Sequence, residues 1–162
     1  MSAIAITRGS PTDVEAVMRI MDAAFDPAFG EAWNRAQLTG IMALGDVWLD
    51  LATPEGGEAP EGFALARRTL DEAELLLLAV RPDARRHGIG AALVEQVASE
   101  ARSRGALRLL LEMRDGNPAL SLYGRAGFAQ IGRRRDYYRG RDRDLHDALT
   151  LARPLARDEP EE

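Results

Sequence analysis

The chain has 162 residues, of which 46% are hydrophobic and 29% are charged, and its formal net charge is −5 at pH 7. A chain of this size can bury its own core as one domain, and with no cysteine and only two histidines it cannot form disulfides or thiolate metal sites and is poorly equipped for a metal centre. No apolar run approaches the roughly 20 residues that cross a bilayer, and the start lacks a signal-peptide pattern, so we expect a cytoplasmic protein.

The N-terminal half alternates short strand and helix patterns. Ser10, Pro11 and Asp13 form a typical helix start, with an N-cap, a proline at the first helical position and an acid in the first turn. Apolar residues then recur at helical spacing as far as Phe25. In chain order we expect a strand at 4–7, helices at 10–25 and 33–44, and an antiparallel hairpin of strands at 46–52 and 63–69.

The C-terminal half has the pattern of a crossover unit followed by a hairpin. The continuous apolar run at 75–80 predicts a central strand covered on both faces. The helix that follows ends at Gly105, and the strand at 107–113 should lie parallel to the central one through a right-handed crossover. A short helix at 118–126, capped by Asn117 and Gly127, and a hairpin of strands at 128–138 and 148–151 complete a mixed sheet. We expect one domain over 1–153 and a disordered acidic tail over 154–162.

The turn between the central strand and the next helix is the first candidate site. It reads RRHGIG, from Arg85 to Gly90, and its two glycines allow a ligand to approach the backbone at a helix start. The free N–H groups there, with arginines nearby, suit a pyrophosphate. A dinucleotide-binding Rossmann turn is excluded because the third glycine and the acid on the next strand are missing. An ordinary turn with solvated arginines is the simpler alternative.

Glu112 and Tyr123 form the second candidate site. Glu112 ends the strand beside the central one, and Tyr123 lies on the following short helix, so both should face the edge that carries the RRHGIG turn. A carboxylate and a phenol can act as base and acid in moving a group onto an amine. Taken singly, each residue is better explained without a catalytic role: Glu112 as a solvated charge at a strand end, and Tyr123 as a core aromatic with its hydroxyl in water.

Taken together, these segments resemble a known family. The run LAVRPDARRHGIGAALVEQVASEARSRGALRLLLEMRDGNPALSLYGRAGF resembles the core of the GNAT acyltransferase superfamily. The segments LEMR, RRRDYYR and HDALTL resemble its RimI-like branch, the ribosomal-protein-alanine N-acetyltransferases. The resemblance implies an α/β fold with a mixed, mostly antiparallel sheet, a central splayed pair of parallel strands and helices on both faces.

The resemblance also implies roles for particular residues. Glu112 would be the general base, acting through water, and Tyr123 the acid that protonates the leaving thiolate of acetyl-CoA, with no metal involved. The acetyl-CoA contacts would come from the splayed strand, the turn and the next loop: Leu78, Ala79, Val80, Arg85, Arg86, His87, Gly88, Ile89, Gly90, Ala91, Asn117 and Tyr123. The acceptor groove would be lined by Trp33, Tyr137 and Tyr138.

Two departures from the family pattern affect these roles. The spacing from Asn117 to Tyr123 is one residue shorter than usual, which puts the acetyl-CoA contact of Asn117 in question. Asp136 replaces the asparagine that usually precedes the paired tyrosines, and it adds a charge near the acceptor groove.

The implied activity is acetyl transfer to a primary amine, above all the N-terminal α-amine of a protein. A lysine side chain or a small-molecule amine is the alternative acceptor, and fold alone does not decide between them. A non-enzymatic module that binds CoA or RNA is a further alternative, because six arginines surround the paired tyrosines between 133 and 143. The acidic net charge and the interleaved aspartates argue against nucleic acid. The sequence names neither the acceptor nor the oligomeric state.

Overall fold

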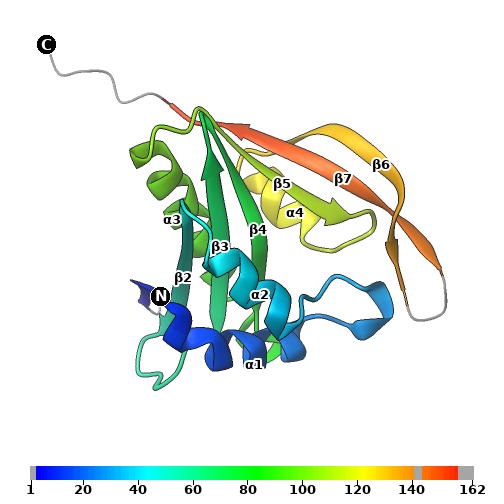
Figure 1. Cartoon of the computed structure of the whole chain (residues 1–162). Helices are drawn as coiled ribbons and strands as arrows, with labels where there is room; N and C mark the ends of the chain where they lie inside the picture. The colour runs from blue at the N-terminus through cyan, green and yellow to red at the C-terminus, as the bar shows by residue number, and fades with distance from the viewer. Residues whose placement is uncertain (1–2, 141–143, 157–162) are drawn as a thin grey trace, which may run out of the picture.

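The computed structural model describes residues 3–140 and 144–156. They form a seven-stranded sheet with the strand order β1-β2-β3-β4-β5-β7-β6, and helices lie on both faces (Figure 1). The strands are β1 (Ile4–Arg8), β2 (Val47–Pro54), β3 (Gly62–Thr69), β4 (Glu72–Val80), β5 (Arg108–Arg114), β6 (Ala129–Arg139) and β7 (Leu145–Pro154). The α-helices are α1 (Val14–Ala24), α2 (Arg35–Met42), α3 (Ile89–Ser103) and α4 (Leu120–Arg125), and the 3-10 helices are η1 (Pro11–Asp13), η2 (Pro27–Phe29) and η3 (Pro82–Ala84).

The helices divide the core into two layers, one on each face of the sheet. The stripe of α3 that includes Leu93 and Val97 packs against β2, β3, β4, β5 and β7, and Tyr123 of α4 belongs to the same cluster. Apolar residues of α1 and α2, among them Met21 and Leu38, pack against the opposite face of β2, β3 and β4. We call these two faces the α3 side and the α1 side. Their existence confirms the predicted fold class.

Local sequence explains where the first helices begin. Ser10 is the N-cap, as predicted, and it forms a capping box with Asp13, because its backbone N–H donates to the Asp13 carboxylate at 2.8 Å. A second capping box, between Asn34 and Gln37, starts α2. The helix predicted from residue 33 therefore begins at Arg35, because Asn34 occupies the N-cap.

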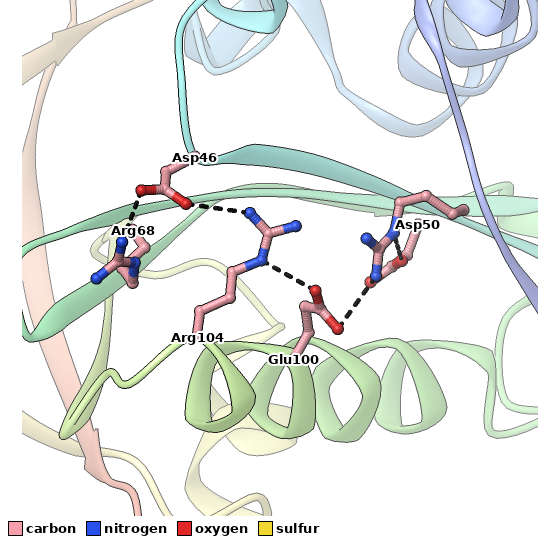
Figure 2. A network of polar contacts seen from close by, with 6 residues as sticks. Asp46, Asp50, Arg68, Glu100 and Arg104 are labelled. Carbon is pink, nitrogen blue, oxygen red and sulfur yellow. Dashed lines mark hydrogen bonds and ion pairs between the residues drawn. The ribbon is translucent and has the colours of Figure 1, made fainter.

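Ion pairs bind α3 to the strands beneath it. Glu100 of α3 contacts Arg8 of β1 at 3.3 Å and Arg104 at 2.9 Å, and Figure 2 shows Glu100 and Arg104 reaching from the helix to the sheet. The guanidinium of Arg104 also lies 4.3 Å from the centre of the Trp48 ring. The connected ion pairs on the α3 side, called the α3-side network, join Arg8, Asp46, Asp50, Arg68, Glu100 and Arg104.

The central strands β4 and β5 pair only over the first part of their length. They are parallel, as predicted, but the ladder runs from Glu72 and Arg108 to Leu75 and Leu111 and then stops. On its other edge β4 pairs with β3 as far as Val80. The two parallel strands therefore splay apart while β4 stays bonded to its other neighbour.

A β-bulge in β4 lies at the point where the splay begins. Leu75 pairs with Ala66 and Leu77 pairs with Leu65, so Leu76 is an extra residue without a partner on β3. The bulge reverses the alternation of side chains, because Leu75 packs on the α3 side whereas Leu77 packs on the α1 side. A bulge bends its strand and increases the local twist, which turns the end of β4 away from β5.

The ends of predicted elements near the C-terminus also differ from the structure. The helix predicted at 118–126 is shorter, because the side chain of Asn117 accepts a hydrogen bond from the Ala119 N–H at 2.9 Å and α4 starts only at Leu120. The strand predicted at 148–151 extends to Pro154, and Leu155, in the predicted tail, donates its N–H to the Leu107 carbonyl. Residues 157–162 of that tail, and Arg141 and Arg143 of the arginine-rich stretch, lie outside the described residues.

Within the described residues, no helix has the length and apolar character needed to span a membrane.

Candidate active site

A cavity of about 1050 Å³ lies where β4 and β5 part. Residues 74–80 of β4 form one wall, and the end of β5 with α4 forms another. The segment between α1 and α2, the start of α3 and the end of β6 complete the lining. The cavity brings together all the residues predicted to bind acetyl-CoA or the acceptor, or to act in catalysis, with the exception of His87.

The free edge of β4 offers backbone groups to this cavity. Beyond Leu75 no strand of the described residues pairs with the β5-facing edge of β4, although Leu78, Ala79 and Val80 remain bonded to β3 on the other edge. These three residues line the cavity. An unpaired strand edge can bind an extended molecule by adding it as a further strand, which is the arrangement expected for the pantetheine arm.

The RRHGIG turn begins α3 with a left-handed cap. Gly88 is the N-cap residue and has a φ of 82°, a conformation that favours glycine. Gly90 allows close packing instead, since a Cβ there would lie 3.1 Å from Cδ2 of Leu122. The first N–H groups of α3 are thereby free to face an anion on the cavity side.

Arg85 is exposed, and its guanidinium holds this turn in place through two backbone carbonyls. Its Nε donates to the Val80 carbonyl at 3.2 Å, and an Nη donates to the Ala24 carbonyl at the end of α1 at 3.0 Å. Arg86 lines the cavity as predicted. His87 does not, because it lies in a separate, smaller hollow beside Glu61 and Asp83.

Glu112 and Tyr123 both line the cavity, Glu112 from the α1 side of the sheet and Tyr123 from the α3 side. Leu111 and Met113 pack on the α3 side, so Glu112 between them faces the α1 side, where its carboxylate pairs with Nε of Arg134 at 3.1 Å. Tyr123 is buried and stacks edge-on against Phe128, with ring centres 5.6 Å apart. Burial, with a contribution from the charge of Glu31, raises the pKa of Tyr123 above its usual value, so the phenol keeps its proton.

The paired tyrosines owe their position to an irregular stretch of β6. Arg134 pairs with Ala148 and Tyr138 pairs with His146, which leaves three residues of β6 opposite Asp147 alone. Asp136, within this stretch, has a φ of 54° and donates its N–H to the Asp147 carboxylate at 3.0 Å. Asparagine and aspartate tolerate this left-handed conformation, so the residue before the tyrosines has a backbone role that its charge alone did not suggest.

The three residues predicted to form the acceptor groove, Trp33, Tyr137 and Tyr138, all line the cavity. The rings of Tyr137 and Tyr138 pack edge-on with centres 5.1 Å apart. Burial, followed by the negative charges of Glu31 and Glu112, raises the pKa of Tyr138 to about 12. The backbone N–H of Trp33 contacts the sulfur of Met21, which fixes the segment between α1 and α2 against the helix.

Sequence reasoning missed a cluster centred on Glu31. The nearly buried Glu31 carboxylate accepts a hydrogen bond from Arg114 Nε at 2.6 Å, and Asn117 contacts its other oxygen at 3.4 Å. The guanidinium of Arg114 also lies 3.8 Å from the centre of the Phe29 ring. Asn117 thus binds the segment between α1 and α2 and the start of α4. No local pattern predicts a pair whose members are 83 residues apart.

The described residues contain no group of histidines, aspartates and glutamates that could hold a metal ion. The side chains and backbone groups in the cavity suit general acid and base chemistry on an extended, anionic molecule that donates a group to an acceptor. The cavity combines an open strand edge, a helix start, a buried phenol and acidic side chains in one place.

Comparisons with known proteins show the family to which the chain is similar. The family model described as "Acetyltransferase (GNAT) family" matches residues 14–128. The [ribosomal protein bS18]-alanine N-acetyltransferase of Escherichia coli (strain K12) is 37% identical over 126 residues, which cover 77% of this chain and 84% of that protein.

Solved structures extend the likeness to almost the whole chain. The crystal structure of the ribosomal-protein-S18-alanine N-acetyltransferase from Escherichia coli matches with a TM-score of 0.84 and 31% identity over 99% of both chains. Arabidopsis thaliana NAA60, solved in complex with acetyl-CoA, shares the fold with a TM-score of 0.79 at 20% identity, covering 94% of this chain and 99% of that one.

Proposed function

Because this chain belongs to the GNAT acetyltransferase family, and is therefore an acyltransferase that uses acetyl-CoA, we propose that it acetylates the N-terminal α-amine of a protein. The observation that supports this most directly is the gap between β4 and β5, flanked by Glu112 and Tyr123. The relatives that acetylate a ribosomal protein are the basis for choosing a protein N-terminus as acceptor.

The donor half of the gap suits acetyl-CoA. The unpaired edge of β4 at Leu78 to Val80 binds the pantetheine arm as an additional strand, and the backbone N–H near Val80 faces the thioester oxygen, where negative charge develops. The start of α3, behind Gly88, binds the pyrophosphate through backbone N–H groups and the helix dipole. Arg86 adds positive charge at the same end.

The reaction is a direct attack without a covalent enzyme intermediate. The acceptor ammonium loses a proton to Glu112, directly or through water, and its nitrogen bonds to the thioester carbon. The tetrahedral intermediate then collapses with cleavage of the carbon–sulfur bond, and Tyr123 gives its proton to the leaving thiolate. The nitrogen loses two protons in total: the first passes from Glu112 to solvent, and the second, lost as the intermediate collapses, replaces through water the proton that Tyr123 gave to the CoA thiol.

The acceptor half of the gap is shaped for an extended chain that carries an amine. Trp33 from the segment between α1 and α2 and Tyr137 and Tyr138 from β6 line its walls. Acidic side chains there favour a positively charged acceptor. Arg134 and Arg133, two members of the arginine-rich stretch, are each paired with carboxylates, which leaves less positive charge for RNA.

The proposal is tested by measuring thiol release from acetyl-CoA with three acceptors. The first is a six-residue peptide with a free N-terminal alanine, the second is a blocked peptide with one internal lysine, and the third is a small diamine. We expect the free N-terminal peptide to give the highest kcat/KM. Preference for lysine or for the diamine would overturn the proposed acceptor and leave the donor unchanged.

A further inference from the structure

One carboxylate in the cavity has no partner. Four acidic side chains line the cavity, and three of them are engaged: Asp26 by the Ala28 N–H, Glu31 by Arg114 and Glu112 by Arg134. Within residues 3–140 and 144–156, Glu74 makes no hydrogen bond or ion pair. A charged group left unpaired beside a binding cavity is available to a ligand of opposite charge.

The register of the sheet places Glu74 beside Glu112. Glu74 aligns with Leu110 in the parallel ladder, and Glu112 lies two residues further along β5. Strand spacing and rise put their Cα atoms about 8 Å apart. Because Ala73 and Leu75 pack on the α3 side, Glu74 points to the α1 side, as Glu112 does. The two carboxylates therefore face the same space at the start of the splay.

Charged groups on three strands surround Glu74. Arg67 lies directly opposite it on β3, Glu112 is on β5 and Arg134 is on β6. The surrounding strands partly desolvate the carboxyl group, and the charge of Glu112 adds to this effect, so the pKa of Glu74 is raised above its usual value despite the two arginines. A cation bound between the two carboxylates would offset the repulsion between Glu74 and Glu112.

We propose that Glu74 binds the ammonium group of the acceptor, beside the base Glu112. The inference rests on the proposed function and divides the acceptor chemistry between two strands: Glu74 holds the charged amine, and Glu112 removes its proton. An N-terminal α-amine has a pKa near 8 and arrives mostly as the ammonium ion at neutral pH. Glu112 shares its charge with Arg134, whereas the carboxylate of Glu74 is free to pair with this cation.

The test separates binding from chemistry. In Glu74→Gln we expect KM for the alanine-first peptide to rise about tenfold, since a hydrogen bond to a charged group is lost, while KM for acetyl-CoA and kcat change little. Inhibition by the N-acetylated form of the same peptide, which has no ammonium group, should stay as in the wild type. Glu74→Asp keeps the charge and should restore most of the affinity.

Glu72→Gln is the matched control. Glu72 lies two residues earlier on the same strand and face, but it pairs with Arg108 and does not line the cavity. This substitution removes the same charge and should leave both KM values unchanged. Equal effects of Glu72→Gln and Glu74→Gln would overturn the proposal, because they would report net charge and not a binding contact.

The pH dependence provides a second readout that a structural role would not give. The ratio of acceptor KM values, Glu74→Gln over wild type, should be largest between the raised pKa of Glu74 and the pKa of the amine. It should fall toward one at lower pH, where Glu74 is protonated, and at higher pH, where the amine is neutral. A ratio independent of pH would contradict an ion pair.

Failure of the proposed function would look different from failure of this inference. If the wild type acetylates only lysine or a small amine, the acceptor assignment is wrong, and the same variants are then measured with that amine. If the wild type acetylates the alanine-first peptide but Glu74→Gln matches it in every KM, Glu74 has no part in binding the ammonium group.

Discussion

On the α3 side of the sheet, three arginines and three carboxylates alternate in a chain of ion pairs, and each carboxylate contacts at least one arginine (Figure 2). On the α1 side, where the cavity opens, Glu31 and Glu112 each form an ion pair with one arginine, and Glu74 forms no ion pair among the described residues. The first arrangement fastens α3 to β1, β2 and β3. The second arrangement leaves the carboxylate of Glu74 without an ion pair. The comparison therefore distinguishes charged residues that stabilise the fold from a charged residue that is available to a ligand.

Burial raises the pKa of a carboxylate in both regions, but the arginines around the two carboxylates differ. Asp50 is 1% exposed, and burial, with a contribution from the charge of Glu100, raises its pKa although Arg8 contacts it at 3.1 Å. Burial and the charge of Glu112 raise the pKa of Glu74 in the same way, and Arg134 and Arg67 oppose that shift without forming an ion pair with it. A raised pKa therefore does not by itself indicate a binding site, and what distinguishes Glu74 from Asp50 is the lack of an ion-pair partner among the described residues.

The largest expected effect tests the cavity side of this comparison. Replacing Glu112 with Gln should lower kcat between 10²- and 10⁴-fold, on the order expected for loss of a general base, with the greatest loss at neutral pH. Binding of CoA, measured by calorimetry, should stay the same because Glu112 faces the acceptor side. Full activity across the pH range would mean that another group takes the proton.

Tyr123→Phe should have the next largest effect. The ring and its contact with Phe128 remain, so only the proton of the phenol is lost, and we expect kcat to fall on the order of 10²-fold or somewhat less if water replaces it. Steady-state kinetics with one peptide would measure this, and an unchanged melting temperature would show that packing is intact. Normal turnover would assign the acid role to water.

Glu100→Gln tests the opposite side, where stability should change and catalysis should not. Burial opposes ionisation of Glu100, but hydrogen bonds from Arg104 and Arg8 outweigh it and lower its pKa. The stability that this carboxylate contributes is therefore present above its unfolded pKa and is lost as pH falls through the folded value. We expect a loss of about 1 kcal/mol or less in urea unfolding at neutral pH, with unchanged kcat and KM.

The smallest effect has the opposite sign. Because the pKa of Glu74 is raised in the folded protein, wild-type stability declines as pH rises from the unfolded pKa through the folded one. Glu74→Gln cannot ionise, so it should unfold at a slightly higher urea concentration than the wild type at neutral pH. The difference should shrink as pH falls below the folded pKa, and a neutral-pH loss of stability would argue that Glu74 supports the fold.

The structural features that the sequence predicts are those that depend on residues close together in the chain. The N-cap at Ser10, the apolar stripe of α3 and the turn around Gly88 each depend on residues a few positions apart. The same holds for the parallel order of β4 and β5, which follows from a strand, a helix and a strand in succession. For these elements the chain pattern and the structure agree.

The parts that the sequence did not predict depend on distant partners or on a uniform pattern. The Leu76 bulge lies within four consecutive leucines, where no alternation exists to show a change of face. Glu31 and Arg114 are far apart in the sequence and come into contact only in the folded chain. The sequence indicated only that Asp136 adds a charge, whereas its φ of 54° shows that it also has a backbone role. The candidate catalytic pair could be named beforehand through family resemblance, whereas Glu74 emerged only from the register.

The bulge at Leu76 also makes the shape of the sheet sensitive to the deletion of a single residue. Deleting one leucine from the run would restore simple alternation in β4 and let its pairing with β5 continue beyond Leu75. The resulting sheet would gain backbone hydrogen bonds in the place now open to the donor. One residue in β4 can therefore separate a continuous sheet from a sheet with an open strand edge.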